Sequence, residues 1–107
     1  MSDPRTVDSG TMHVGIARLW LRMPENASLK DKRQVLRSLI QRIRNEFHVA
    51  VAEVGAQDEW QVACLGVSTV SGDARLARQV MDKVVGFVRE TRLDADLYDY
   101  EAEVEQF

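Results

Sequence analysis

The segment HVAVAEVGAQDEWQVACLGVSTV, residues 48–70, holds two apolar runs separated by a short polar stretch. The first run, residues 48–54, is rich in valine and alanine and stops at Gly55, which is typical of a strand that is apolar on both sides. The second run, residues 60–70, alternates between two sets of side chains and predicts another strand. Because only residues 57–59 remain for the turn, the two strands are predicted to pair antiparallel.

A strand and a helix precede this hairpin. Residues 12–22, MHVGIARLWLR, alternate with the period of a strand, and Pro24 ends it because proline cannot donate to a sheet ladder. Ser28 followed by Asp31 has the spacing of a helix capping box. Apolar residues then recur at steps of three and four, which predicts an amphipathic helix over residues 28–47.

A helix and a strand follow the hairpin. Asp73 supplies N-cap chemistry, and apolar residues from Leu76 to Val88 keep helical spacing in a helix that runs to about Arg92. Residues 95–105 alternate apolar and acidic side chains and predict a fourth strand. The order β-α-β-β-α-β predicts an α+β fold, the ferredoxin-like sandwich. Right-handed crossovers then give a four-stranded antiparallel sheet of order 4-1-3-2 with two helices on one face.

Length and composition bound the class of protein. With 107 residues, 45% of them hydrophobic and 29% charged, the chain has room for one globular domain. Residues 12–107 are predicted to form it, and residues 1–11 to be a mobile leader because they offer nothing periodic to bury. There is no run of about 18 apolar residues and no signal-peptide stretch, so we expect a cytoplasmic protein without a membrane partner.

Cysteine and histidine usage argues against metal or cofactor chemistry. The single cysteine, Cys64, lies within a predicted strand, where a thiol is usually a small buried hydrophobe. His13 and His48 have no neighbouring residues at ligand spacing. The glycines form no dinucleotide-binding motif. We therefore expect no metal, no cofactor and no catalytic residue, and a non-enzymatic protein is the preferred interpretation.

Charge is distributed unevenly along the chain. Residues 28–47 hold six lysines and arginines against two acids, a net charge of +4, whereas residues 93–107 hold six acids and no lysine or arginine. In the predicted fold these segments lie on opposite flanks. The whole chain has a net charge of -3 and a pI near 5.3, which argues against a dedicated nucleic-acid coat protein.

The basic residues of the first predicted helix form a candidate RNA-binding surface. At about 100° per residue, most of them fall on a stripe that faces out of the core. Such a stripe can contact RNA phosphates and release counterions. The alternative is a solvated helix face whose long side chains cover apolar surface. The candidate residues are Lys30, Lys32, Arg33, Arg37 and Arg44.

Two further features predict a protein interface. Trp20 on the first strand and Trp60 at the start of the third are predicted to share the sheet face without helices, where the alternatives are base stacking and ordinary partial burial. The second strand is an edge strand on which only Glu53 is charged, so it lacks protection against pairing with other chains. The residues expected to contribute to self-association, as in a homodimer, are Val49, Val51 and Val54.

Opposite charges are predicted to face each other across the first and fourth strands. Arg18 and Arg22 face the same way as three acids of the fourth strand, Asp99, Glu101 and Glu103. Tyr98 and Tyr100 alternate with these acids and are predicted to share the opposite face. We interpret the charges as cross-strand ion pairs, each contributing about 0.2–1 kcal/mol, rather than as a carboxylate catalytic site.

Five short stretches of the sequence together resemble one family. They are SLKDKR at residues 28–33, VAVAEVG at 49–55, QDEWQ at 57–61, LGV at 65–67 and MDKV at 81–84. These resemble the YlxP-like family of small bacterial proteins, a family of unknown function. The resemblance covers about residues 12–104, and Met12 matches the usual family start, so residues 1–11 are expected to be an addition or a misassigned start.

The resemblance implies a ferredoxin-like domain whose genes are often found beside those for translation initiation and ribosome maturation, and it implies no established reaction. We therefore expect a non-enzymatic factor that binds ribosomal RNA or a ribosomal subunit through the basic helix. The alternative is a self-associating structural or regulatory module that uses the edge of the second strand or the open sheet face. An enzyme for small anionic substrates, a third class, needs a pocket where arginines converge.

Overall fold

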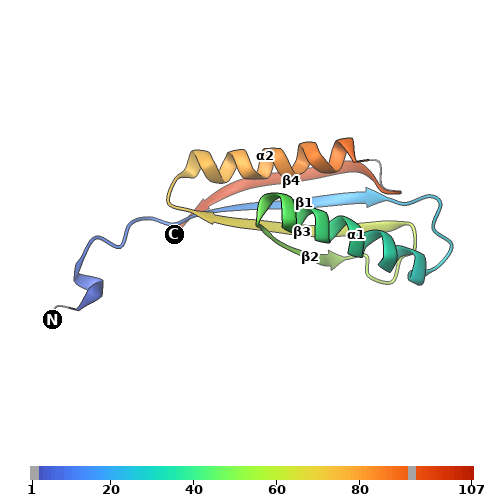
Figure 1. Ribbon diagram of the computed structural model, residues 1–107, viewed down its shortest axis with the longest axis horizontal. Helices are drawn as coiled ribbons and strands as arrows, with labels where there is room; N and C mark the ends of the chain where they lie inside the picture. The colour runs from blue at the N-terminus through green and yellow to red at the C-terminus, as the bar shows by residue number, and fades with distance from the viewer. Residues whose placement is uncertain (1–2, 92–93) are drawn as a thin grey trace.

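The computed structural model describes residues 3–91 and 94–107. Within them, four strands and two long helices follow one another in the predicted order (Figure 1). Their bounds are β1 (His13–Arg22), α1 (Leu29–Phe47), β2 (Ala50–Gly55), β3 (Val62–Ser71), α2 (Ala74–Glu90) and β4 (Asp96–Gln106). The predicted α+β fold and its β-α-β-β-α-β order are confirmed.

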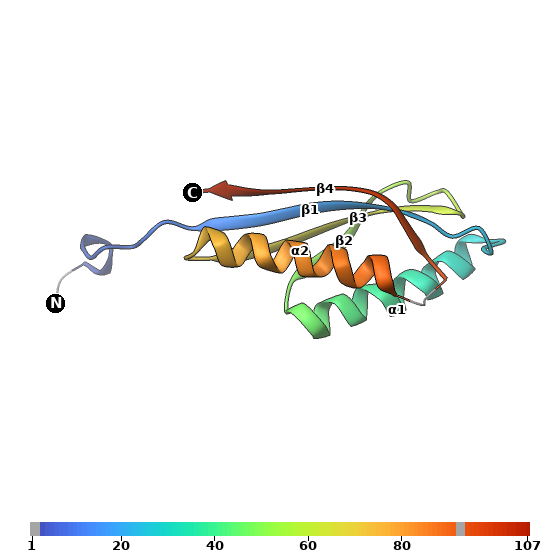
Figure 2. The same ribbon diagram turned by 90° about the horizontal axis from the view of Figure 1, so that it is seen from above.

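The strands form one antiparallel sheet with the order β2-β3-β1-β4, as right-handed crossovers predict. Figure 2 shows both helices against the same face of the sheet. α1 packs against β2, and α2 packs against β1, β3 and β4. The sheet therefore has a helix-covered face, which holds the core, and an open face without a helical cover.

Alternation along β1 decides which side chains enter the core. Ala17, Leu19 and Leu21 are buried beneath the helices, whereas Arg18 and Arg22, which alternate with them, are exposed on the open face. Fully burying a large apolar side chain contributes about 1.5–3 kcal/mol, so this face stabilises the fold. Other buried side chains of the core are Leu36, Leu39 and Ile43 of α1, Leu65 of β3, and Met81, Val84 and Val88 of α2.

The two ends of α1 are set by local hydrogen bonds. At its start, the Ser28 hydroxyl accepts a hydrogen bond of 3.1 Å from the backbone N–H of Asp31, which confirms the predicted N-cap. At its end, His48 adopts a left-handed conformation with φ of 53° and donates its N–H back to the last turn. His48 therefore ends the helix, and β2 begins at Ala50 rather than at residue 48 as predicted.

α2 differs from its prediction in one apolar residue. The Asp73 carboxylate accepts a hydrogen bond of 2.8 Å from the N–H of Arg75, so the predicted N-cap is confirmed. Leu76, which was predicted to face the core, is 52% exposed. The buried residues of α2 begin one position after Leu76, and they are Ala77, Met81, Val84, Val85 and Val88. The last helical residue is Glu90, and Arg92, the predicted end, lies outside the described residues.

A bulge in the pairing of β1 with β4 separates the two tyrosines of β4. The register shifts near the start of β4 and leaves Tyr98 as an extra residue in that strand. The Arg22 guanidinium lies 4.3 Å from the centre of the Tyr98 ring, whereas Arg89 of α2 lies 5.5 Å from the centre of the Tyr100 ring. The two rings thus meet arginines on opposite sides of the sheet, and the prediction that they share one face is wrong.

Residues 3–11 are exposed throughout and extend away from the sheet (Figure 1). Pro4–Thr6 form a turn of 3-10 helix capped by the Asp3 carboxylate, a feature that the sequence analysis did not predict. The chain joins the sheet at Met12, which exchanges two backbone hydrogen bonds of 2.7 Å with Phe107. None of the helices in the described ranges combines the length and the hydrophobicity that a transmembrane span requires.

Candidate functional site

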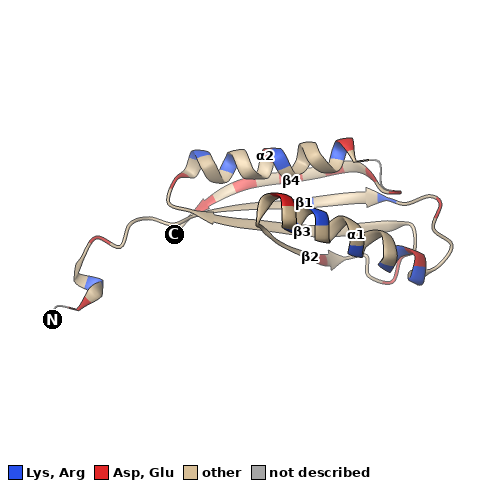
Figure 3. Ribbon diagram, viewed as in Figure 1, with Lys and Arg blue, Asp and Glu red and all other residues tan. Residues whose placement is uncertain are grey.

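Positive charge is concentrated in the helix layer. α1 and α2 together hold ten lysines and arginines against four acids, a net charge of +6. Because the whole chain has a net charge of -3, its other segments together carry -9. Figure 3 shows basic residues along both helices and acidic residues along β4. The two sides of the molecule therefore have opposite electrostatic character.

Three of the five cations predicted to bind RNA form one exposed row. Lys30, Arg33 and Arg37 lie three and four positions apart on α1, and all three are exposed. Within the described part of the chain, none of them forms an ion pair with a carboxylate. We call these three residues the α1 cation row. Their exposure is as predicted, and their contact with RNA stays a prediction.

Lys32 does not belong to this surface. Its side chain is only 2% exposed, and its Nζ lies 2.8 Å from Glu53 Oε2 of β2. The same Nζ donates a hydrogen bond of 2.5 Å to the carbonyl of Ala56, in the turn that joins β2 to β3. The prediction of Lys32 as an RNA contact is therefore wrong, because the protein's own carboxylate neutralises it inside the fold. A signal existed in the sequence, since Lys32 continues the buried series Leu36 and Ile43 by one more turn.

Arg44 also forms a hydrogen bond within the protein. Its side chain remains exposed, but its Nη2 donates a hydrogen bond of 2.7 Å to the carbonyl of Val51 on β2. On the same helix, the Arg42 guanidinium lies 5.5 Å from the centre of the Phe87 ring of α2. Arg44 was predicted to belong to the RNA-binding surface. In the structure it instead bridges α1 to the edge strand and does not extend the α1 cation row.

A small cleft lies beside the α1 cation row. It has a volume of about 250 Å³ and is formed by α1, β2 and the turn after β2. Exposed Arg33, Arg37 and Gln57 line it together with the buried pair of Lys32 and Glu53. We call it the α1 cleft. Because Lys32 is already neutralised, the two arginines are the groups in this cleft that are available to an anion.

The three valines predicted for self-association point in different directions. Val49 and Val51 are buried in the core, so their side chains are not available to a partner, and an interface at these two residues would use the backbone of the edge strand. Val54 is 53% exposed on the open face and lies over Gly66, where a Cβ atom would sit 2.9 Å from Val54 Cγ1. The hydrogen bond from Arg44 occupies one carbonyl of this edge strand. Self-association through the β2 edge stays a prediction.

The two tryptophans occupy different settings. Trp20 is half-buried on the open face of β1, and the Arg18 guanidinium lies 5.9 Å from the centre of its ring. Trp60 precedes β3, which begins at Val62, so its predicted place at the start of that strand is wrong. It is 52% exposed, and its carbonyl accepts a hydrogen bond of 3.0 Å from the Asn26 side chain. Its role as an interface residue stays a prediction.

The predicted ladder of ion pairs between β1 and β4 is only partly formed. Arg18 pairs with Glu101 at 3.6 Å, and both side chains are more than half exposed. Exposed pairs of this kind contribute about 0–1 kcal/mol. Arg22 contacts the ring of Tyr98 instead of an acid. Among residues 3–91 and 94–107, no three His, Cys, Asp or Glu side chains gather in a way that could hold a metal ion.

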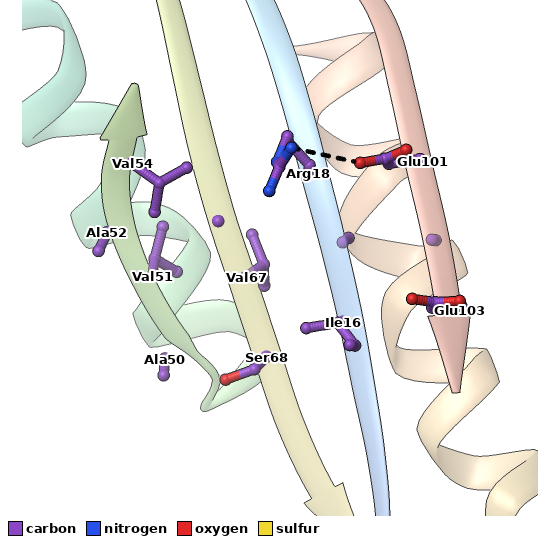
Figure 4. A pocket seen from close by; sticks show the side chains of 13 residues that line it. Ile16, Arg18, Ala50, Val51, Ala52, Val54, Val67, Ser68, Glu101 and Glu103 are labelled. Atoms are coloured by element: carbon purple, nitrogen blue, oxygen red, sulfur yellow. Dashed lines mark ion pairs between the residues drawn. The ribbon is translucent and has the colours of Figure 1, made fainter. Parts of the chain in front are cut away.

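A larger hollow, which the sequence analysis did not predict, lies on the open face. It has a volume of about 540 Å³ and extends from β2 to β4 (Figure 4). Its centre lies over small side chains of β2 and β3, and its far wall is acidic. We call it the open-face groove. The residues that shape it are Ala50, Ala52 and Val54 of β2, Gly66 and Ser68 of β3, Ile16 and Arg18 of β1, and Glu101 and Glu103 of β4.

Cys64 lies on β3 opposite Trp20 and is buried, as predicted. Burial raises the pKa of the Cys64 thiol, and the nearby Arg18 guanidinium offsets part of this. Because the thiolate is the reactive form, we expect iodoacetamide to alkylate folded Cys64 more slowly at pH near 8 than it alkylates the urea-unfolded chain, and we expect the difference to shrink as the pH rises further. Mass spectrometry measures both rates. Equal rates near pH 8 would contradict this.

Comparisons with known proteins find one family and one curated relative. A family model described as a protein of unknown function, DUF503, matches residues 14–102. The chain is 32% identical over 75 residues to the uncharacterized protein YlxP of Bacillus subtilis (strain 168), a match that covers 70% of this chain and 82% of that protein.

Two solved structures resemble the chain at low sequence identity. The de novo designed protein Foldit4 matches with a TM-score of 0.47 and 12% identity, over 89% of this chain and 96% of that one. A C-terminal segment of the alpha subunit of aIF2 from Pyrococcus abyssi matches with a TM-score of 0.47 and 14% identity, over 94% of this chain and 52% of that one.

Proposed function

The chain belongs to the DUF503 family, and we propose that it binds structured RNA, alone or within a ribonucleoprotein, through the α1 cation row. The observation that carries this proposal is three exposed cations on one helix face with no carboxylate partner in the described residues. The helix layer to which they belong has a net charge of +6, which favours the approach of a polyanion.

The shape of the α1 cation row suits a phosphate backbone better than a small anion. At a rise of 1.5 Å per residue, the row extends about 10 Å along the helix, so its cations can contact more than one phosphate. Arg33 and Arg37 also line the α1 cleft beside Gln57, and arginine can bind a phosphate through two parallel hydrogen bonds. Phosphate contacts position a protein without reading bases, so we expect recognition of RNA shape rather than of sequence.

The salt dependence of binding measures how many cations take part. Each phosphate contact releases counterions, so the affinity falls as the salt concentration rises. For three contacts, an increase from about 50 to about 200 mM salt weakens binding by roughly 20- to 40-fold. Ribosomal RNA and ribosomal subunits are the first probes because the family resemblance implies genes that are often found beside those for translation initiation and ribosome maturation.

We expect the double substitution Arg33→Glu and Arg37→Glu to weaken binding to ribosomal RNA at least about tenfold at low salt, and to flatten its salt dependence. The matched control is Arg5→Glu with Arg75→Glu, which makes the same change in net charge at two exposed positions outside the row. This control should change the affinity by no more than about threefold. An equal loss in both variants, or no loss in the first, would remove the α1 cation row as the binding surface.

A further inference from the structure

We propose that the open-face groove binds a basic amphipathic helix of a partner protein. The proposal concerns the face of the sheet opposite to the α1 cation row, and it does not depend on RNA binding. It rests on the shape of the groove, on the apolar side chains around it, and on the excess of acids on β4.

The groove exists because two neighbouring strands carry small side chains. In the register of the sheet, Ala52 lies opposite Gly66, and Ala50 lies opposite Ser68. None of these four residues has a side chain that extends far above the sheet, so the surface is hollow there (Figure 4). Val54 lies over Gly66 and bounds the hollow on β2. Strands lie about 4.8 Å apart, so a face four strands wide spans roughly 14 Å, enough for one helix about 10 Å across.

The surface around the hollow exposes apolar side chains. Ile16 and Val54 line it and are both exposed. Further along the face, Val70 is exposed beside its cross-strand partner Val14, and Trp20 lies toward the other end of β1. Several exposed apolar side chains on one face of a small domain are typical of a surface that meets another macromolecule.

The acids of β4 decide the charge of the occupant. Glu101 and Glu103 line the groove opposite Arg18 and Ile16, and Asp99 and Glu105 continue the row in the neighbouring cross-strand pairs. One of these four acids, Glu101, forms an ion pair of 3.6 Å with Arg18 of β1. A partner that carries lysine or arginine beside its apolar stripe would neutralise this wall. RNA would instead bring phosphates against carboxylates.

A second copy of the chain does not match this face. If two copies stack with their open faces together about an axis along the strands, β4 of one lies over β2 of the other, whose open-face side chains are Ala50, Ala52 and Val54. If the axis runs across the strands, β4 lies over β4 and acids face acids. Neither arrangement supplies cations to the β4 acids.

An added strand also cannot occupy the groove, because β1 and β3 are paired on both sides, whereas a helix binds through its side chains.

The probe is a synthetic helix of leucine and lysine, about 18 residues long and amphipathic, with a leucine–glutamate helix as its charge-reversed counterpart. We expect the full-length protein to bind the lysine peptide, measured by anisotropy of a labelled peptide, and not the glutamate peptide. The substitutions Glu101→Gln and Glu103→Gln together should weaken binding about tenfold, roughly threefold for each rim charge. The matched control is Glu46→Gln with Glu90→Gln, two exposed helix positions, and it should change the affinity less than about twofold.

A substitution that fills the groove provides an independent test. Ala52→Trp places a large side chain over Gly66 and should abolish peptide binding, whereas Gln79→Trp at an exposed position of α2 should leave it intact. Because the glutamine variants alter only exposed carboxylates, they decide the proposal even if Ala52→Trp fails to fold. Equal binding of both peptides, or an equal loss in both glutamine pairs, would overturn it. So would a dimer in sedimentation that Ala52→Trp dissociates, because the occupant would then be a second copy.

Discussion

Lys32→Met is expected to lower the free energy of unfolding by about 3 kcal/mol. Methionine keeps most of the side-chain volume but removes the ammonium group that lies 2.8 Å from Glu53 Oε2. That oxygen is itself buried, so the substitution leaves a carboxylate in the fold without its cation. Breaking a buried pair typically costs about 3–5 kcal/mol, and we place the effect at the lower end because the Glu53 side chain is 27% exposed.

The double substitution Lys32→Met with Glu53→Met tests whether the unpaired carboxylate causes the loss of stability in Lys32→Met. Replacing both members of a buried pair by apolar groups of similar volume is often neutral or stabilising. We therefore expect the double variant to regain most of the lost stability, to within about 1 kcal/mol of the native chain, apart from the lost hydrogen bond to Ala56. Urea unfolding measures all three proteins. A double variant as unstable as Lys32→Met would show that the ion pair is not the reason for the loss.

The second large effect is expected at Gly15 on β1, where α2 crosses the sheet closely. A Cβ atom at this position would lie 2.9 Å from the backbone carbonyl of Ala77, 2.9 Å from Met81 Cγ and 3.1 Å from Thr69 Cγ2. The carbonyl belongs to the helix backbone, so it can move only if α2 moves. Valine favours strands, yet Gly15→Val should destabilise the fold by about 3 kcal/mol, because it overpacks this contact.

Gly86→Ala is the matched control for Gly15, since it adds a Cβ atom where the structure has space. Gly86 lies within α2, and apart from the backbone of its own helix and its chain neighbours nothing lies within 4 Å of the position that its Cβ would take. Alanine favours the helix over glycine by about 0.5–1 kcal/mol, so this substitution should raise the stability. Thermal or urea unfolding should thus give changes of opposite sign at the two glycines. A stable Gly15→Val variant would show that α2 does not depend on this close approach.

The elements and their order could be predicted from the sequence because they depend on patterns within each segment. The alternation along β1 and the three-and-four spacing along α1 follow from the periods of strand and helix. Ser28 and Asp73 mark helix starts through hydrogen bonds to residues two or three positions away. The sheet order then follows from the handedness of crossovers, which is independent of the particular side chains.

The candidate site could be predicted only in part. The sequence identified Lys30, Arg33 and Arg37 on the exposed side of α1, because helical spacing alone separates them from the apolar arc. Helical spacing also places Lys32 on the buried side of α1 with Leu36, but the carboxylate that neutralises it lies on β2 and is brought beside it only by folding. Arg44 is likewise tied to β2 by a hydrogen bond that no local pattern indicates.

Local patterns were thus enough to predict the helices, the strands and the exposed row of cations, because periodicity and capping act over a few residues, and the handedness of crossovers added the topology. Three features arise only when the chain is folded: Lys32 is neutralised, Val51 faces the core, and small residues on β2 and β3 leave a hollow beside the acids of β4. These features depend on contacts and registers between segments far apart in the chain. A shift of one residue in such a register would turn each side chain to the other face.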